Sequence, residues 1–128
     1  MMYVTSPIEQ RVSGALSAEK LRSLPREMLD VLRVLIVYGG ASWKSELARE
    51  LPLFRAFEGG PAPVNEMKLD EALRRLEKEG LVKVEKRVRA DMGAQGSEED
   101  ELVTIVDISA TRNALAKDRV LTSYIRGK

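Results

Sequence analysis

The segment from Met67 to Lys86 constrains the fold more than any other part of the chain. Its first half carries apolar residues at the three- and four-residue spacing that places side chains on one face of an α-helix. These are Leu69, Ala72, Leu73 and Leu76. Gly80 follows, and glycine most readily adopts the positive φ found just past a helix C-terminus. The pattern predicts a helix over 66–79 that ends at Gly80 and continues directly as a strand.

Two strands are predicted after Gly80, over 81–90 and 101–108. In the first strand, alternation places valines on one side and charged residues on the other. A polar, glycine-containing loop over 91–100 joins the strands, so they are expected to form a β-hairpin with a long tip.

A shorter helix is predicted upstream, over about 43–50. Ser42 is expected to cap its N-terminus, and Pro52 is expected to stop it because proline cannot donate a backbone hydrogen bond. The connection over 53–64 contains several glycines and prolines, so it is not expected to be one continuous helix. Phe54 within it is predicted to pack on the core.

The chain is long enough for one domain but not for two, at 128 residues. Residues 1–16 are predicted to form an N-terminal arm, and Ser17 to cap a short helical turn. A longer helix is predicted over 25–38. Residues 17–109 form the predicted domain, and residues 110–128 the predicted C-terminal helix. The expected fold class is α+β and mostly helical, with the element order α-α-α-β-β-α.

Composition excludes several classes of function. The chain has no cysteine and no histidine, so disulfides, thiol catalysis and the usual general base are excluded. An enzyme is not expected, and no metal or other cofactor is predicted. The sequence contains neither an apolar run of bilayer length nor a signal peptide, so a cytoplasmic location without membrane contact is expected. The charged content of 32% is compatible with a thermophile.

A helix ending in Leu-Glu-Lys-Glu-Gly-Leu-Val that continues as a basic strand resembles the second half of a winged helix-turn-helix. The resemblance covers about 25–108 and is to small winged-helix regulators, including the MarR-like and PadR-like types. It implies a DNA-binding transcriptional regulator whose third helix enters the major groove of double-stranded DNA. The hairpin, or wing, would then contact the backbone. The connection over 53–64 is longer than the three or four residues of a tight helix-turn-helix.

The resemblance also implies which residues contact DNA. The helix at 66–79 and its cap would supply Asn65, Lys68, Arg74 and Arg75, and the wing strand would supply Lys83, Arg87 and Arg89. Asn65 would pair with adenine, Lys68 with guanine or phosphate, and the arginines with phosphate or guanine. Asn65 is equally suited to cap the helix.

Other charges leave an alternative open. Glu66, Asp70 and Glu71 lie near the start of the same helix, where carboxylates favour the helix dipole but repel phosphates. Four more acidic residues, at 98–101, are expected at the wing tip. The alternative is a winged-helix protein-interaction module or adaptor in a replication, transcription or repair assembly, docked through this acidic tip.

The regulator is expected to act as a homodimer. The apolar face of the C-terminal helix would either pair with a second copy, which is favoured, or cover the domain. The formal net charge is only +1. Modest DNA affinity per copy follows, so two copies would be needed to neutralise enough phosphates.

Overall fold

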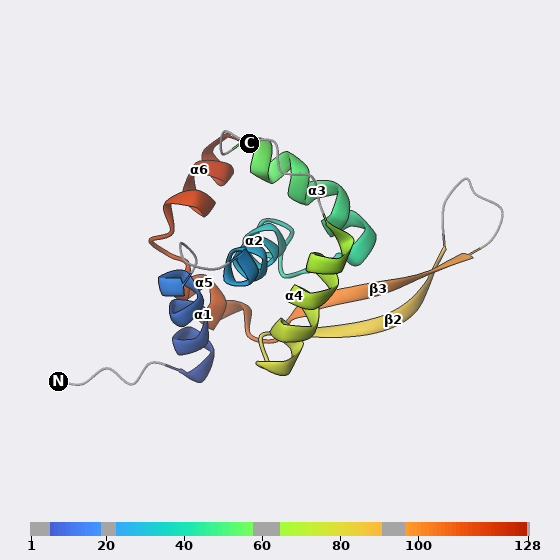
Figure 1. The fold of residues 1–128 in the computed structure, drawn as a ribbon, viewed down its shortest axis with the longest axis horizontal. Coiled ribbons are helices and arrows are strands. Elements are labelled where there is room, and N and C mark those ends of the chain that lie inside the picture. Colours follow the sequence, from blue (N-terminus) through green and yellow to red (C-terminus); the bar gives the residue numbers. More distant parts are fainter. Residues whose placement is uncertain (1–5, 19–22, 58–64, 91–96, 128) are drawn as a thin grey trace.

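The structure is a computed structural model, and it describes residues 6–18, 23–57, 65–90 and 97–127. The fold is α+β and mostly helical, with a three-stranded antiparallel sheet, which confirms the predicted fold class at this level (Figure 1). The helices are α1 (Pro7–Ala18), α2 (Ser23–Val37), α3 (Lys44–Phe57), α4 (Glu66–Lys78), α5 (Ile108–Ala114) and α6 (Arg119–Gly127). The strands are β1 (Ala41–Trp43), β2 (Val82–Ala90) and β3 (Ser97–Ile105).

Helix α2 forms the centre of the molecule. It contacts α1, α3, α4, α5 and the sheet, and these elements surround it in Figure 1. Most of its side chains are therefore buried. The buried apolar residues are Met28, Leu29, Val31, Leu32, Val34, Leu35 and Ile36.

The strand order in the sheet is β1-β3-β2, so β3 is the central strand. Ser42 lies in β1 and pairs with Val103 of β3. Helix α3 begins at Lys44, two residues later, so the prediction that Ser42 caps this helix is wrong. The local capping signal is overridden because the backbone of 41–43 adds a third strand to the hairpin. Strands β2 and β3 extend as a long ribbon away from the helices (Figure 1).

Helix α3 continues through Pro52 to Phe57, so the prediction that Pro52 ends it is also wrong. An interior proline removes one helical hydrogen bond and crowds the preceding turn. Leu51 and Phe54 lie on either side of Pro52 and are both fully buried. Their packing favours a continuous helix despite the proline. The remainder of the predicted connection, 58–64, lies outside the described residues.

The segment predicted as an arm contains helix α1 instead. Val12 is fully buried, and Ile8 and Leu16 pack against the same core at the four-residue spacing of a helix. Ser17 lies within this helix, where its hydroxyl donates to the carbonyl of Ser13 at 3.1 Å, so it does not begin a new turn. Residues 1–5 lie outside the described part of the chain.

The predicted C-terminal helix is divided into α5 and α6. Asp107 caps α5 by accepting from the backbone N–H of Ala110 at 3.0 Å. Asp118 caps α6 by accepting from the backbone N–H of Leu121 at 3.1 Å. Each cap satisfies helix N–H groups that would otherwise lack a partner, so the chain stops one helix and starts another.

A buried network of charged side chains joins α2 to α3 and to the start of α6. Arg33 donates to Asp30 at 3.0 Å and to Asp118 at 2.7 Å. Arg55 donates to Asp30 at 3.1 Å and also pairs with Glu27. Burial raises the pKa of Asp30, and the two neighbouring guanidinium groups act in the opposite direction.

Candidate nucleic-acid interface

Helix α4 carries most of the predicted site, and both of its ends are fixed by local chemistry. The Asn65 side chain accepts from the backbone N–H groups of Met67 at 3.0 Å and Lys68 at 3.3 Å. At the other end, Gly80 adopts a φ of 75°. The N–H of Leu81 then donates back to the carbonyl of residue 76 at 2.9 Å, which closes a Schellman motif. The predicted cap and the predicted end of this helix are confirmed.

One face of α4 packs on the core and the opposite face is exposed. The buried side chains are Leu69, Ala72, Leu73 and Leu76, as the spacing predicts. The exposed side chains are Glu66, Met67, Lys68, Glu71, Arg74, Arg75, Glu77 and Lys78. Met67 is 79% exposed, so the outer face of α4 offers both charge and an apolar surface.

The sheet side of α4 has mixed charge. Lys44 at the start of α3 pairs with Asp70, and the hydrogen bond to Asp70 raises the pKa of Lys44. A carboxylate oxygen of Glu77 accepts from the backbone N–H of Val84 in β2 at 3.0 Å. This bond attaches the C-terminal half of α4 to the hairpin. Arg74 lines the groove between α4 and the hairpin on this side.

The predicted wing contacts do not lie on the face of the hairpin next to α4. Val84 and Lys86 line the groove beside α4. Alternation along β2 therefore directs Lys83 and Arg87 to the other face of the sheet. There they pair with Glu85 at 3.1 Å and 2.7 Å. Hydrogen bonds from Arg87 and then Lys83 lower the pKa of Glu85.

The remaining wing residue, Arg89, pairs with Glu98 in the strand register, and its side chain lies outside the described part of the structure. Strand β3 begins at Ser97, so the acidic run at 98–101 belongs to the strand. The prediction that this run forms the tip is wrong. Asp100 accepts from the hydroxyl of Ser45 and thereby contacts the start of α3.

The structure places Lys68 and Arg75 on one side of α4 and Arg74 on the side next to the hairpin. Lys83 and Arg87 lie on the far face of the hairpin, away from all three.

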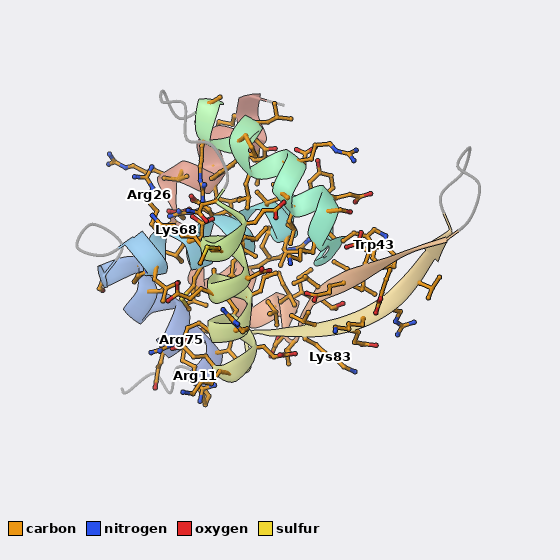
Figure 2. The ribbon with its side chains drawn as sticks, turned by 45° about the vertical axis from the view of Figure 1, so that its right-hand side comes forward. Arg11, Arg26, Trp43, Lys68, Arg75 and Lys83 are labelled. Atoms are coloured by element: carbon orange, nitrogen blue, oxygen red, sulfur yellow. The ribbon has the colours of Figure 1, made fainter. Side chains whose placement is uncertain are left out.

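Two further cations near α4, Arg11 on α1 and Arg26 on α2, were absent from the predicted site. Apolar residues recur every four positions around Arg11, at Ile8, Val12 and Leu16. This spacing could have indicated that the segment is a helix packed on the core. Arg11 donates to the carbonyl of Glu79 at the end of α4, and Figure 2 labels both Arg11 and Arg26.

Asn65 is expected to act first as a cap. Both N–H groups that it satisfies point at its side-chain oxygen, which adenine pairing would also need. Asn65→Ala should lower the free energy of unfolding by about 1 kcal/mol. Asn65→Ser should restore most of it, because serine also caps helices. Thermal and urea unfolding measure both changes, and equal losses in the two variants would contradict the capping role.

Comparison with protein-family models gives no match for this chain, and comparison with curated proteins gives none either. Among the described residues, no helix has both the length and the apolar composition needed to cross a bilayer. Within the same residues, acidic side chains form no group of three or more placed to hold a metal ion.

Proposed function

We propose that this chain is a winged-helix DNA-binding protein that acts as a transcriptional regulator. The observation that carries the proposal is the exposed outer face of α4, which is supported from behind by α2 and flanked by the hairpin. The element order from α2 to β3, with β1 added to the hairpin edge, agrees with that architecture.

Cations on α4 supply the attraction for DNA. Lys68, Arg74, Arg75 and Lys78 are all exposed. A helix fits the major groove of B-form DNA, where arginine can donate two hydrogen bonds to guanine and lysine can contact guanine or phosphate. Arg75 also pairs with Glu79 at 3.3 Å. At this exposure the pair adds little stability, so exchange of Glu79 for a phosphate costs little.

Charge reversal on α4 tests the proposal. We expect Arg74→Glu with Arg75→Glu to weaken binding to double-stranded DNA about 100-fold at low salt, because phosphate contacts become repulsive. Fluorescence anisotropy at two salt concentrations measures the loss. The control is Lys117→Glu with Arg119→Glu, which changes net charge equally at the exposed junction of α5 and α6. Binding that is absent at low salt, or that survives the α4 reversal, would refute the proposal.

The active form in this proposal is a homodimer. An open, mainly apolar groove of about 460 Å³ lies between α2, α5 and α6. Ile125 on its rim is 53% exposed, and a second copy would cover it. The stoichiometry of the same DNA titration reports how many copies bind each site.

The protein-interaction alternative is favoured by one observation. Met67 and Glu71 share the outermost line of α4 with Arg74 and Lys78, so the exposed face mixes apolar, acidic and basic groups. A partner protein can use all three kinds of group, whereas the phosphates of DNA attract only the cations. A chain that binds no DNA at low salt would favour this alternative.

A further inference from the structure

Four cations follow the side of α4 that faces α1 and α2. Arg11 extends from α1, Arg26 from the first turn of α2, and the other two from α4 itself. All are exposed, and we refer to them as the seam cations: Arg11, Arg26, Lys68 and Arg75. In the view of Figure 2 their labels run from Arg26 through Lys68 and Arg75 to Arg11, and Arg11 and Arg75 border one groove.

The positions of the seam cations are defined by backbone geometry. Lys68 and Arg75 are seven residues apart, so they project from the same side of α4 about 10 Å apart along its axis. Arg11 is held at the C-terminal end of α4, because its guanidinium donates to the carbonyl oxygen of Glu79. Lys68, Arg75 and Arg11 therefore form a line along the helix, and Arg26 lies on the first turn of α2.

Arg11 and Arg75 also border a groove of about 400 Å³ between α1, α2 and α4. Its other walls are largely apolar. They are formed by Gly14, Ala15, Leu24, Pro25 and Met28, with Glu79 at the rim. Apolar walls lower the local dielectric constant, so these guanidinium groups attract an anion more strongly than they would on a flat, fully hydrated surface.

Carboxylates only partly neutralise this side of α4. Among the described side chains on α4, Glu71 and Glu79 are the ones that flank the seam cations. Glu27 follows Arg26 in sequence but is buried against Arg55, so it does not offset the charge of Arg26 at the surface. The seam keeps an excess of positive charge.

The described side chains of the hairpin have no such excess. The strand register places Lys86 opposite Glu101, Arg87 opposite Asp100 and residue 89 opposite residue 98. Opposite charges directly across an antiparallel pair attract each other. Lys83 and Arg87 also pair with Glu85 within β2, so carboxylates of both strands offset the described cations of the hairpin.

We infer that the backbone of double-stranded DNA follows the seam between α4 and the helices α1 and α2, with Arg11 and Arg26 binding phosphates. The inference rests on the proposed function, and it moves the main backbone contact from the hairpin to the opposite side of α4. Phosphate contacts fix the position of a protein on DNA. Helix α1 thus becomes part of the DNA-binding surface.

Neutral substitutions of the two outer seam cations test this inference. Arg11→Gln with Arg26→Gln should weaken DNA binding about 10-fold near 0.1 M salt. The negative slope of log K against log salt should become shallower by about 2. Lys117→Gln with Arg119→Gln removes the same charge at the α5–α6 junction and should leave the slope unchanged. Arg11→Lys with Arg26→Lys keeps the charge and should bind like the unmodified chain.

The outcomes separate the inference from the proposed function. If Arg11→Gln with Arg26→Gln leaves affinity and salt slope unchanged while the α4 reversal abolishes binding, the seam inference fails and the proposed function stands. If the unmodified chain binds no DNA at low salt, both fail. Equal melting temperatures across the variants exclude loss of folding as the cause. If the double glutamine variant is unstable, the single variants Arg11→Gln and Arg26→Gln supply the test, and each should reduce the magnitude of the salt slope by about 1.

Discussion

Replacing Arg33 by alanine is expected to lower the free energy of unfolding by about 3–5 kcal/mol. Arg33 is 1% exposed, and its guanidinium lies between the carboxylates of Asp30 and Asp118. Removing it leaves Asp118 without this cation and Asp30 with Arg55 alone. Desolvated carboxylates that lose a cation destabilise the folded state strongly. Urea unfolding followed by circular dichroism measures the change.

The matched control is Arg87→Ala. Arg87 donates to Glu85 at 2.7 Å, the same distance as the Arg33–Asp118 contact, but its side chain is 55% exposed. Solvent screens such a pair, so its removal should cost far less than the loss of Arg33. If Arg33→Ala and Arg87→Ala lowered the free energy of unfolding by similar amounts, burial would not be what makes the Arg33 ion pairs important for stability. In the double variant Arg33→Ala with Asp118→Asn, the two losses should be less than additive, because both remove one interaction.

The buried network also explains where the C-terminal helix breaks. Asp118 uses one carboxylate both to accept from Arg33 and to cap α6. These bonds hold the start of α6 against α2. A single straight helix through this region would move Asp118 away from Arg33 and leave a buried guanidinium without that partner. Keeping the buried Arg33–Asp118 ion pair thus stabilises the fold more than one continuous C-terminal helix would.

Sequence patterns predicted correctly the features that depend only on neighbouring residues. The cap at Asn65, the apolar line on α4 and the turn at Gly80 all depend on residues within a few positions of one another. The β2–β3 hairpin follows directly in sequence, so its existence was also predictable. Its register was not, because the glycine-containing tip permits several alignments.

The parts that were wrong depend on contacts distant in sequence. Ser42 joins a strand because it lies beside Val103, and α3 passes Pro52 because residues around it are buried by other helices. The candidate site was affected in the same way. The sequence indicated that β2 is basic, but the pairing with acidic β3, and the approach of Arg11 to the end of α4, appear only in the folded chain.

Replacing Phe54 by alanine is expected to destabilise the protein by about 3–5 kcal/mol. Phe54 is fully buried, and its ring meets the ring of Tyr124 on α6 edge to face, with centroids 4.7 Å apart. It lies in the part of α3 beyond Pro52, where the proline weakens the helix. The variant loses the buried apolar surface of the ring and leaves a cavity, and both effects destabilise the folded state. Loss of the contact with Tyr124 accounts for about 0.5–1.5 kcal/mol of the total. Urea unfolding measures the total.

Leu53→Ala provides the control in the same turn of α3. Leu53 is 60% exposed, so its truncation should change stability by no more than about 0.5 kcal/mol. Tyr124→Leu should remove the ring contact while keeping most of the apolar volume, and its loss should overlap with that of Phe54→Ala. A loss from Phe54→Ala as small as that from Leu53→Ala would mean that α3 beyond Pro52 is not docked on α6. The packing that overrides the proline would then have to come from Leu51 alone.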